Sequence, residues 1–121
     1  MTINILAVDD SRTMRDIIRL ALLPAGFAVH TADDGLHAVD VLDTVVPDAI
    51  ITDINMPRMD GFGLIDVVRG LKQHRTTPIL VLTTEAAPAL KQRARDAGAT
   101  GWIVKPFEPS KLIKALHLVT G

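Results

Sequence analysis

The fold of the chain can be predicted by starting from one segment, Asp48-Ala49-Ile50-Ile51-Thr52-Asp53-Ile54-Asn55-Met56-Pro57. Its short apolar run follows a proline and ends in the carboxylate of Asp53, which is the pattern of a buried strand with a polar residue at its end. Pro57 cannot continue a strand, because proline has no backbone N–H to donate. Taken alone, Asp53 is more typical of a turn residue, so its role depends on what the other strands present at their ends.

Four further apolar runs lie on either side of this segment. They cover residues 3–8, 27–31, 79–82 and 102–104, and each is predicted as a strand. After the first, second, third and fifth strands, apolar residues recur at the spacing of an amphipathic helix, and a proline and a glycine mark the ends of a helix after the fourth. Alternation of five strands with five helices through short loops predicts an α/β fold, namely a doubly wound, five-stranded parallel sheet with helices on both faces.

Proline and glycine mark the ends of several predicted helices. The second helix is expected to reach Pro47, with apolar positions at Leu36, Val39, Leu42 and Val46. Pro88 suits the first turn of the fourth helix, and Gly98 suits its C-terminal cap. Asp33-Asp34-Gly35 and Asp60-Gly61 are interpreted as turns before helices, with no function of their own.

The composition limits the function classes. The chain has 121 residues, of which 48% are hydrophobic and 22% charged, as expected for one globular domain. The net charge of −1 argues against a basic surface for nucleic acid or for an anionic membrane. Cysteine is absent, so disulfide and thiolate chemistry is excluded. Neither a signal peptide nor a long apolar segment is found, and we expect a cytoplasmic protein.

Polar residues with complementary chemistry follow four of the five predicted strands. They are Asp9-Asp10, Asp53, Thr83 and Lys105, and parallel strands bring their carboxyl ends to one edge of the sheet. Three carboxylates at one edge repel each other unless a cation joins them, and hard oxygen ligands suit Mg²⁺. An ammonium and a hydroxyl can contact phosphoryl oxygens, and a carboxylate can accept the phosphoryl group covalently.

The order and spacing of Asp9-Asp10, Asp53, Thr83 and Lys105-Pro106 resemble the response-regulator receiver domain of two-component signalling. The resemblance covers the whole chain. It implies the flavodoxin-like, CheY-like fold with strand order 2-1-3-4-5. It also implies that residues 1–121 form a single receiver domain with no output domain.

The resemblance assigns roles to the residues at the strand ends. Asp53 would accept the phosphoryl group, Lys105 would pair with a phosphoryl oxygen as a point charge, and Thr83 would move its hydroxyl onto that group. The Mg²⁺ ligands would be Asp9, Asp10, Asp53 and the backbone carbonyl of Asn55. The chain would then be a phosphoacceptor with self-phosphorylation and self-dephosphorylation chemistry only, and not an enzyme.

The resemblance also implies a two-state switch. Trp102 stands where the family has a mobile aromatic residue, usually Tyr or Phe; the alternative is a plain core or surface anchor. Phosphorylation would act through Thr83 and Trp102 on the surface of the fourth helix, fifth strand and fifth helix. That partner surface would present Lys91, Arg95, Trp102, Lys111 and Lys114. The Lys105-Pro106 peptide is expected to be cis.

Within the family, the closest resemblance is to single-domain chemotaxis regulators of the CheY type. Asn55 and Glu85 match that type at positions that govern dephosphorylation. A histidine kinase of the CheA type would be the phosphodonor, a flagellar motor switch protein would be the partner, and the protein would be a monomer. The alternatives are a phosphate sink or phosphorelay intermediate, and a constitutive, unphosphorylated binding module. A phosphatase with an aspartyl nucleophile is disfavoured. Such enzymes usually place the nucleophile after the first strand with a second Asp two residues further on, whereas Asp9 and Asp10 are adjacent.

Overall fold

Five short apolar segments pair into one parallel sheet in the computed structural model, which describes residues 2–121. The order across the sheet is β2-β1-β3-β4-β5, as the resemblance implied. The strands are β1 (Asn4–Val8), β2 (Ala28–Ala32), β3 (Ala49–Thr52), β4 (Ile79–Thr83) and β5 (Gly101–Val104). Their positions agree with the predicted strands to within one residue, which is the usual uncertainty of element ends.

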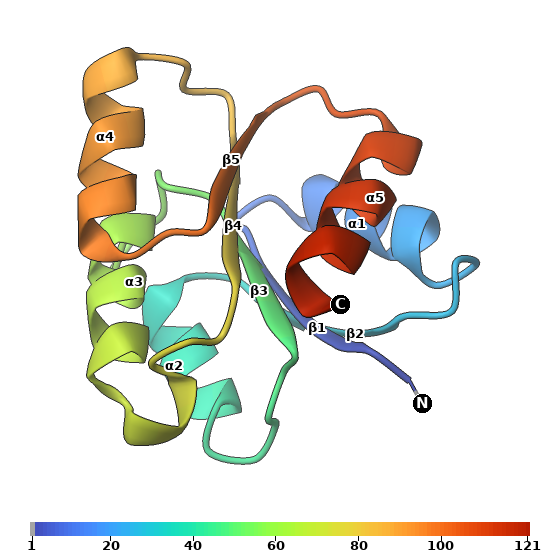
Figure 1. Ribbon diagram of the computed structural model, residues 1–121, viewed down its shortest axis with the longest axis horizontal. Coiled ribbons are helices and arrows are strands. Elements are labelled where there is room, and N and C mark those ends of the chain that lie inside the picture. Colours follow the sequence, from blue (N-terminus) through green and yellow to red (C-terminus); the bar gives the residue numbers. More distant parts are fainter. Residues whose placement is uncertain (1) are drawn as a thin grey trace.

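Helices cover both faces of the sheet. Their bounds are α1 (Arg12–Leu22), α2 (Gly35–Val41), α3 (Gly61–Gly70), η1 (Lys72–His74, a 3₁₀ turn), α4 (Pro88–Ala97) and α5 (Pro109–Thr120). Figure 1 shows α2, α3 and α4 on one face of the sheet and α1 and α5 on the other. In residues 2–121, no helix combines the length and the apolar character needed to cross a membrane.

The core has two halves because alternate residues of each strand face opposite layers. In β1, Leu6 and Val8 belong to the half of the core that includes residues of α2, α3 and α4, whereas Ile5 and Ala7 belong to the half that includes residues of α1 and α5. All four side chains are buried. A strand with both faces covered is apolar throughout instead of alternating, which explains the continuous apolar runs in the sequence.

The expectation that the second helix reaches Pro47 is wrong. Helix α2 ends at Val41, and Val46 is 68% exposed. The chain leaves the helix through turns in which Thr44 N–H donates to the Val41 carbonyl over 3.1 Å. The predicted ends of α4 are confirmed, since Pro88 begins the helix and Gly98 caps it with a φ of 114°.

The pairing of the strands brings their carboxyl ends together. Val8 of β1 is aligned with Thr52 of β3, and Thr83 of β4 is aligned with Val104 of β5. The residues that follow these strands therefore emerge at the same edge of the sheet. The candidate functional site lies at this edge.

Candidate functional site

Lys105 joins two carboxylates at the carboxyl edge of the sheet. Its Nζ donates to Asp9 Oδ2 over 2.6 Å and to Asp53 Oδ2 over 2.9 Å. The side chains of Asp9, Asp53 and Lys105 are only 2%, 12% and 9% exposed. Lys105 is 96 residues from Asp9 and 52 residues from Asp53 along the chain, yet the three side chains meet in one nearly buried cluster of charge-assisted hydrogen bonds.

Burial and pairing act in opposite directions on the charges of this cluster. Burial raises the pKa of Asp9 above its usual value, and the hydrogen bonds from Lys105 and from the Ser11 N–H oppose that rise only in part. Burial disfavours the charge of Lys105, but its bonds to Asp9 and Asp53 outweigh burial and raise the pKa of Lys105. The lysine is therefore held as a cation against the carboxylates.

Asp10 adds a third carboxylate, and the set fits a divalent cation. One carboxylate oxygen from each of Asp9, Asp10 and Asp53 lies within 4.8 Å of the others. Asp10 is exposed to solvent while Asp9 is buried, so the oxygens are open to water on one side. Mg²⁺ favours a site in which a few carboxylates supply oxygen ligands and water molecules fill the other coordination positions. The residues present therefore fit the metal that the sequence predicted.

Backbone contacts hold Asp53 and its surroundings in place. The Ile54 N–H donates to Asp53 Oδ1 over 2.6 Å, and the Gly61 N–H donates to the Ile54 carbonyl over 2.9 Å. A Cβ atom on Gly61 would collide with the Asp53 carbonyl oxygen. Glycine at the start of α3 thus lets the helix approach the backbone that carries Asp53.

Glu85 connects the other predicted site residues. Its side chain accepts a hydrogen bond from Asn55 Nδ2 over 3.1 Å, and its backbone N–H donates to Thr83 Oγ1 over 3.4 Å. The Glu85 carbonyl accepts from Trp102 Nε1 over 3.0 Å. Thr83 is buried at the end of β4, and Trp102 is half-buried on β5. We call the site formed by Asp9, Asp10, Asp53, Asn55, Thr83 and Lys105 the pocket. Glu85 therefore connects two residues of the pocket, Asn55 and Thr83, with Trp102, the only tryptophan.

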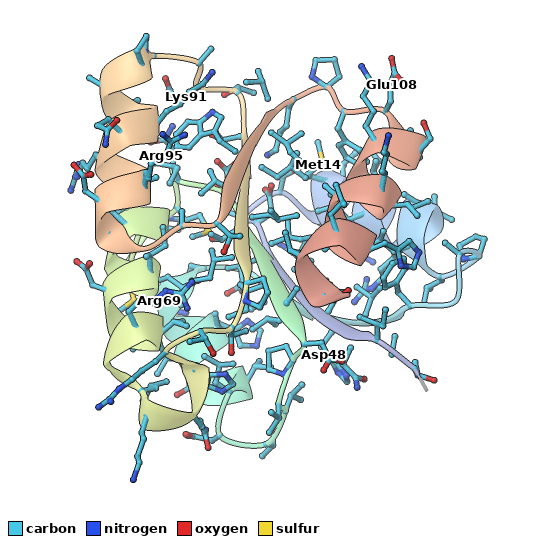
Figure 2. All side chains as sticks on the ribbon, in the orientation of Figure 1. Met14, Asp48, Arg69, Lys91, Arg95 and Glu108 are labelled. Atoms are coloured by element: carbon cyan, nitrogen blue, oxygen red, sulfur yellow. The ribbon has the colours of Figure 1, made fainter. Side chains whose placement is uncertain are left out.

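The predicted partner surface is brought together in part. Lys91, Arg95 and Trp102 line a hollow of about 70 Å³ between α4 and β5. Figure 2 shows Lys91 and Arg95 along α4, on the side of the helix toward β5. Lys111 and Lys114 are exposed on α5 and do not line this hollow. The Lys105-Pro106 peptide is cis, as expected.

Sequence reasoning did not predict two contacts that support Asp9. Arg15, on α1, donates from its guanidinium to the Asp9 carbonyl over 2.6 Å, and Ser11 donates its N–H to Asp9 Oδ1 over 2.9 Å. Ser11 also caps α1 by accepting from the Met14 N–H. A serine before a helix predicts a cap. No sequence pattern distinguishes Arg15 from the other arginines of α1.

The chain is similar in sequence and in fold to many known proteins. Residues 5–117 match the response regulator receiver domain family. Response regulator MprA of Mycobacterium tuberculosis is 37% identical over 117 residues, which cover 97% of this chain and 50% of MprA. The chain therefore spans about half the length of the curated relatives that it matches.

Solved structures show the same fold at high similarity. Chemotaxis protein CheY4 of Vibrio cholerae is 45% identical, with a TM-score of 0.94, over 98% of this chain and 99% of CheY4. The receiver domain of sensor histidine kinase PA1611 from Pseudomonas aeruginosa is 28% identical, with a TM-score of 0.92, over 100% of this chain and 99% of that domain. The PA1611 structure holds a magnesium ion in its active-site cleft.

Proposed function

The chain belongs to the response regulator receiver domain family, and we propose that it is a chemotaxis-type switch that accepts a phosphoryl group on Asp53. Receiver domains of two-component response regulators take their phosphoryl group from a histidine kinase, so family membership implies such a kinase as the phosphodonor. The observation that carries the proposal is the Lys105 ammonium within hydrogen-bonding distance of both Asp9 and Asp53. It supplies a fixed positive charge beside the carboxylate that would be modified.

In the transfer, a carboxylate oxygen of Asp53 attacks the phosphorus of a phosphohistidine. The O–P bond forms, the P–N bond breaks, and the electron pair stays on the imidazole nitrogen, which takes a proton from solvent. Lys105 exchanges its hydrogen bond to the Asp53 carboxylate for one to a phosphoryl oxygen. Its ammonium has three N–H donors, so only this one bond has to change. Positioning and charge neutralisation are what phosphoryl transfer demands of a protein.

A divalent cation is the second part of the proposal. The residues that would hold Mg²⁺ are Asp9, Asp10, Asp53 and the backbone carbonyl of Asn55, and the ion would neutralise charge on the phosphoryl oxygens. The cluster of three carboxylate oxygens supports this assignment, as does the magnesium in the cleft of the PA1611 receiver domain.

The switch would act through the Glu85 connection. A phosphoryl group on Asp53 offers oxygens to the buried Thr83 hydroxyl, which in this state receives a hydrogen bond from the Glu85 N–H. The state in which Thr83 turns to the phosphoryl group is favoured by that new contact, so phosphorylation shifts the population toward it. Because Trp102 is bonded to the Glu85 carbonyl, the shift would reach the partner surface around Lys91, Arg95 and Trp102.

The chemotaxis assignment is supported by the CheY4 likeness and by two pocket residues. CheY4 matches this chain over almost the full length of both. Asn55 and Glu85, which sit at the positions that tune dephosphorylation in the CheY type, are bonded to each other across the pocket. We infer a CheA-type kinase as donor, a flagellar motor switch protein as partner, and action as a monomer in the cytoplasm.

The acceptor is tested by intact mass after incubation with Mg²⁺ and acetyl phosphate. The wild type is expected to gain one phosphoryl group, and Asp53→Asn is expected to gain none. Asp66→Asn, which changes an exposed carboxylate on α3, is the matched control and keeps the gain. Labelling of Asp53→Asn to the wild-type extent would overturn the assignment.

The chemotaxis role needs a separate test. Binding to a flagellar motor switch protein is measured with the free protein and with the protein activated by beryllium fluoride. We expect at least about tenfold tighter binding of the activated form, equivalent to roughly 1.4 kcal/mol. Normal phosphorylation without motor binding would favour the phosphate sink or relay, and motor binding that ignores activation would favour a constitutive binding module.

A further inference from the structure

Arg58 has an unusual backbone conformation in the β3–α3 loop (residues 53–60). Its φ is 64°, and it is the one non-glycine residue with positive φ among residues 2–121. Residues other than glycine rarely adopt this left-handed conformation, and they keep it only where the surrounding structure imposes it. The contacts of the Arg58 side chain show what imposes it here.

The Arg58 guanidinium forms a bidentate pair with Asp34. Nε donates to Asp34 Oδ2 over 2.5 Å, and a terminal nitrogen donates to Oδ1 over 3.0 Å. Asp34 is buried, with 5% of its side chain exposed, and Oδ1 also caps α2 by accepting the His37 N–H over 2.9 Å. A planar fork on a carboxylate fixes orientation as well as distance. The tip of the loop is therefore tied to the start of α2.

A backbone contact reinforces the same junction. The Gly35 N–H donates to the Met59 carbonyl over 3.0 Å. A Cβ atom on Gly35 would lie 2.6 Å from Met59 Cγ and 2.7 Å from the Met59 carbonyl oxygen. The approach of the loop to α2 thus leaves no room for a side chain at residue 35.

The loop is anchored at two points, and Asn55 lies between them. One anchor is the bond from the Gly61 N–H to the Ile54 carbonyl beside Asp53. The other is the Arg58–Asp34 pair. Between them, Asn55 reaches across the pocket to Glu85 and carries the carbonyl assigned to the metal.

We propose that Arg58 and Asp34 are positioning residues for the metal and phosphorylation site, because their pair holds the loop that presents Asn55. The inference rests on the proposed function, since it concerns the same pocket. Neither residue touches the reacting atoms; both act through the loop backbone. Residues that orient metal ligands in this indirect way commonly change metal affinity by tenfold or more when they are removed.

The test uses variants that separate the pair from the turn. Arg58→Gly removes the pair but accepts a positive φ, so the turn itself is unstrained. Asp34→Asn keeps a cap oxygen for α2 but removes the charge. Arg58→Lys leaves a point charge without the fork. Arg75→Ala, which changes an exposed arginine outside the loop, is the matched control.

Three measurements are made on each variant: the Mg²⁺ dissociation constant by calorimetry, amide hydrogen exchange of residues 53–61 without metal, and the melting temperature. Arg58→Gly and Asp34→Asn are expected to raise the dissociation constant about tenfold and to speed exchange in the loop. Arg58→Lys is expected to fall between them and the wild type, and Arg75→Ala to match the wild type.

The outcomes distinguish this inference from the proposed function. A purely structural pair would lower the melting temperature of Arg58→Gly while leaving its Mg²⁺ dissociation constant and loop exchange at wild-type values, and that result would overturn the inference. Failure of the wild type to bind Mg²⁺ would instead overturn the proposed function, and with it the inference.

Discussion

The indole nitrogen of Trp102 donates a hydrogen bond to the backbone carbonyl of Glu85 over 3.0 Å. This bond ties the middle of β5 to the loop after β4, whose backbone N–H at Glu85 contacts Thr83. Because Trp102 is the only tryptophan, the tryptophan fluorescence of the protein reports on the surroundings of this one side chain. The bond gives the proposed switch a defined path of two hydrogen bonds between the pocket and the partner surface.

Thr83→Ala is predicted to separate phosphorylation from the Trp102 response. The variant keeps Asp53 and Lys105, so it should still gain a phosphoryl group from acetyl phosphate. It lacks the hydroxyl that would move onto that group, so the fluorescence change should fall to a small fraction of the wild-type change. Intact mass and fluorescence are followed in the same sample. A full fluorescence change in phosphorylated Thr83→Ala would show that the signal travels by another route.

Lys105→Met is predicted to destabilise the metal-free protein by about 3 kcal/mol, because it leaves two nearly buried carboxylates without their cation. Urea unfolding gives the free energy of unfolding, and Lys114→Met on the exposed face of α5 should change it by less than about 0.5 kcal/mol. Added Mg²⁺ should recover part of the loss, since a ligand of the folded state stabilises it. Equal stability of Lys105→Met and wild type would contradict the ion cluster.

Gly61→Ala and Gly70→Ala are predicted to have opposite effects at the two ends of α3. A Cβ at Gly61 collides with the Asp53 carbonyl, and forcing it in should cost about 1–3 kcal/mol of stability. A Cβ at Gly70 meets nothing within 4 Å, and that substitution should be neutral or stabilise by up to about 1 kcal/mol. The free energies of unfolding decide the matter; a tolerated Gly61→Ala would mean that the loop can retreat from α3.

His74 is predicted to make the protein less stable below neutral pH. It is fully buried in η1, and burial lowers the pKa of its imidazole below 6.5. The unfolded chain then takes up a proton at a higher pH than the folded chain. The stability contribution of neutral His74 is therefore complete above pH 6.5 and is lost as the pH falls from there toward the lowered pKa of the folded state.

The check is the melting temperature at pH 7 and pH 5 for wild type and His74→Asn. The asparagine can keep a contact with Thr77, whose hydroxyl lies 3.0 Å from His74 Nδ1. The drop on acidification should be smaller in the variant than in the wild type. The same drop in both proteins would show that other groups cause it.

The pocket was predictable because its parts follow the ends of apolar runs. Asp53 after residues 49–52 and Lys105 after residues 102–104 lie at one edge as soon as the strands are parallel, and the alternation with helices requires parallel strands. The end of α2 was not predictable in the same way. Leu42 and Val46 continue the helical spacing, yet local turn bonds at Thr44 end the helix at Val41.

Contacts set by packing alone left no trace in the sequence. Arg58 and Asp34 are 24 residues apart, and Arg69 and Gly98, whose carbonyl accepts from the Arg69 guanidinium, are 29 apart. Each arginine looks like a solvated charge in the sequence, and Asp34 looks like a plain turn residue. Their roles follow only from how the β3–α3 loop meets α2 and how α3 meets the end of α4.

The coupling of Asp53 phosphorylation to Trp102 is tested by following intact mass and Trp102 fluorescence together after acetyl phosphate and Mg²⁺ are added. We predict that the wild type gains one phosphoryl group with a fluorescence change of the same time course, and that Asp53→Asn shows neither. Beryllium fluoride, which mimics the phosphoryl group, should reproduce the fluorescence change if hydrolysis keeps the phosphorylated fraction low. A wild-type protein that gains no mass and gives no response to beryllium fluoride would show that Asp53 is not the phosphoryl acceptor of a switch.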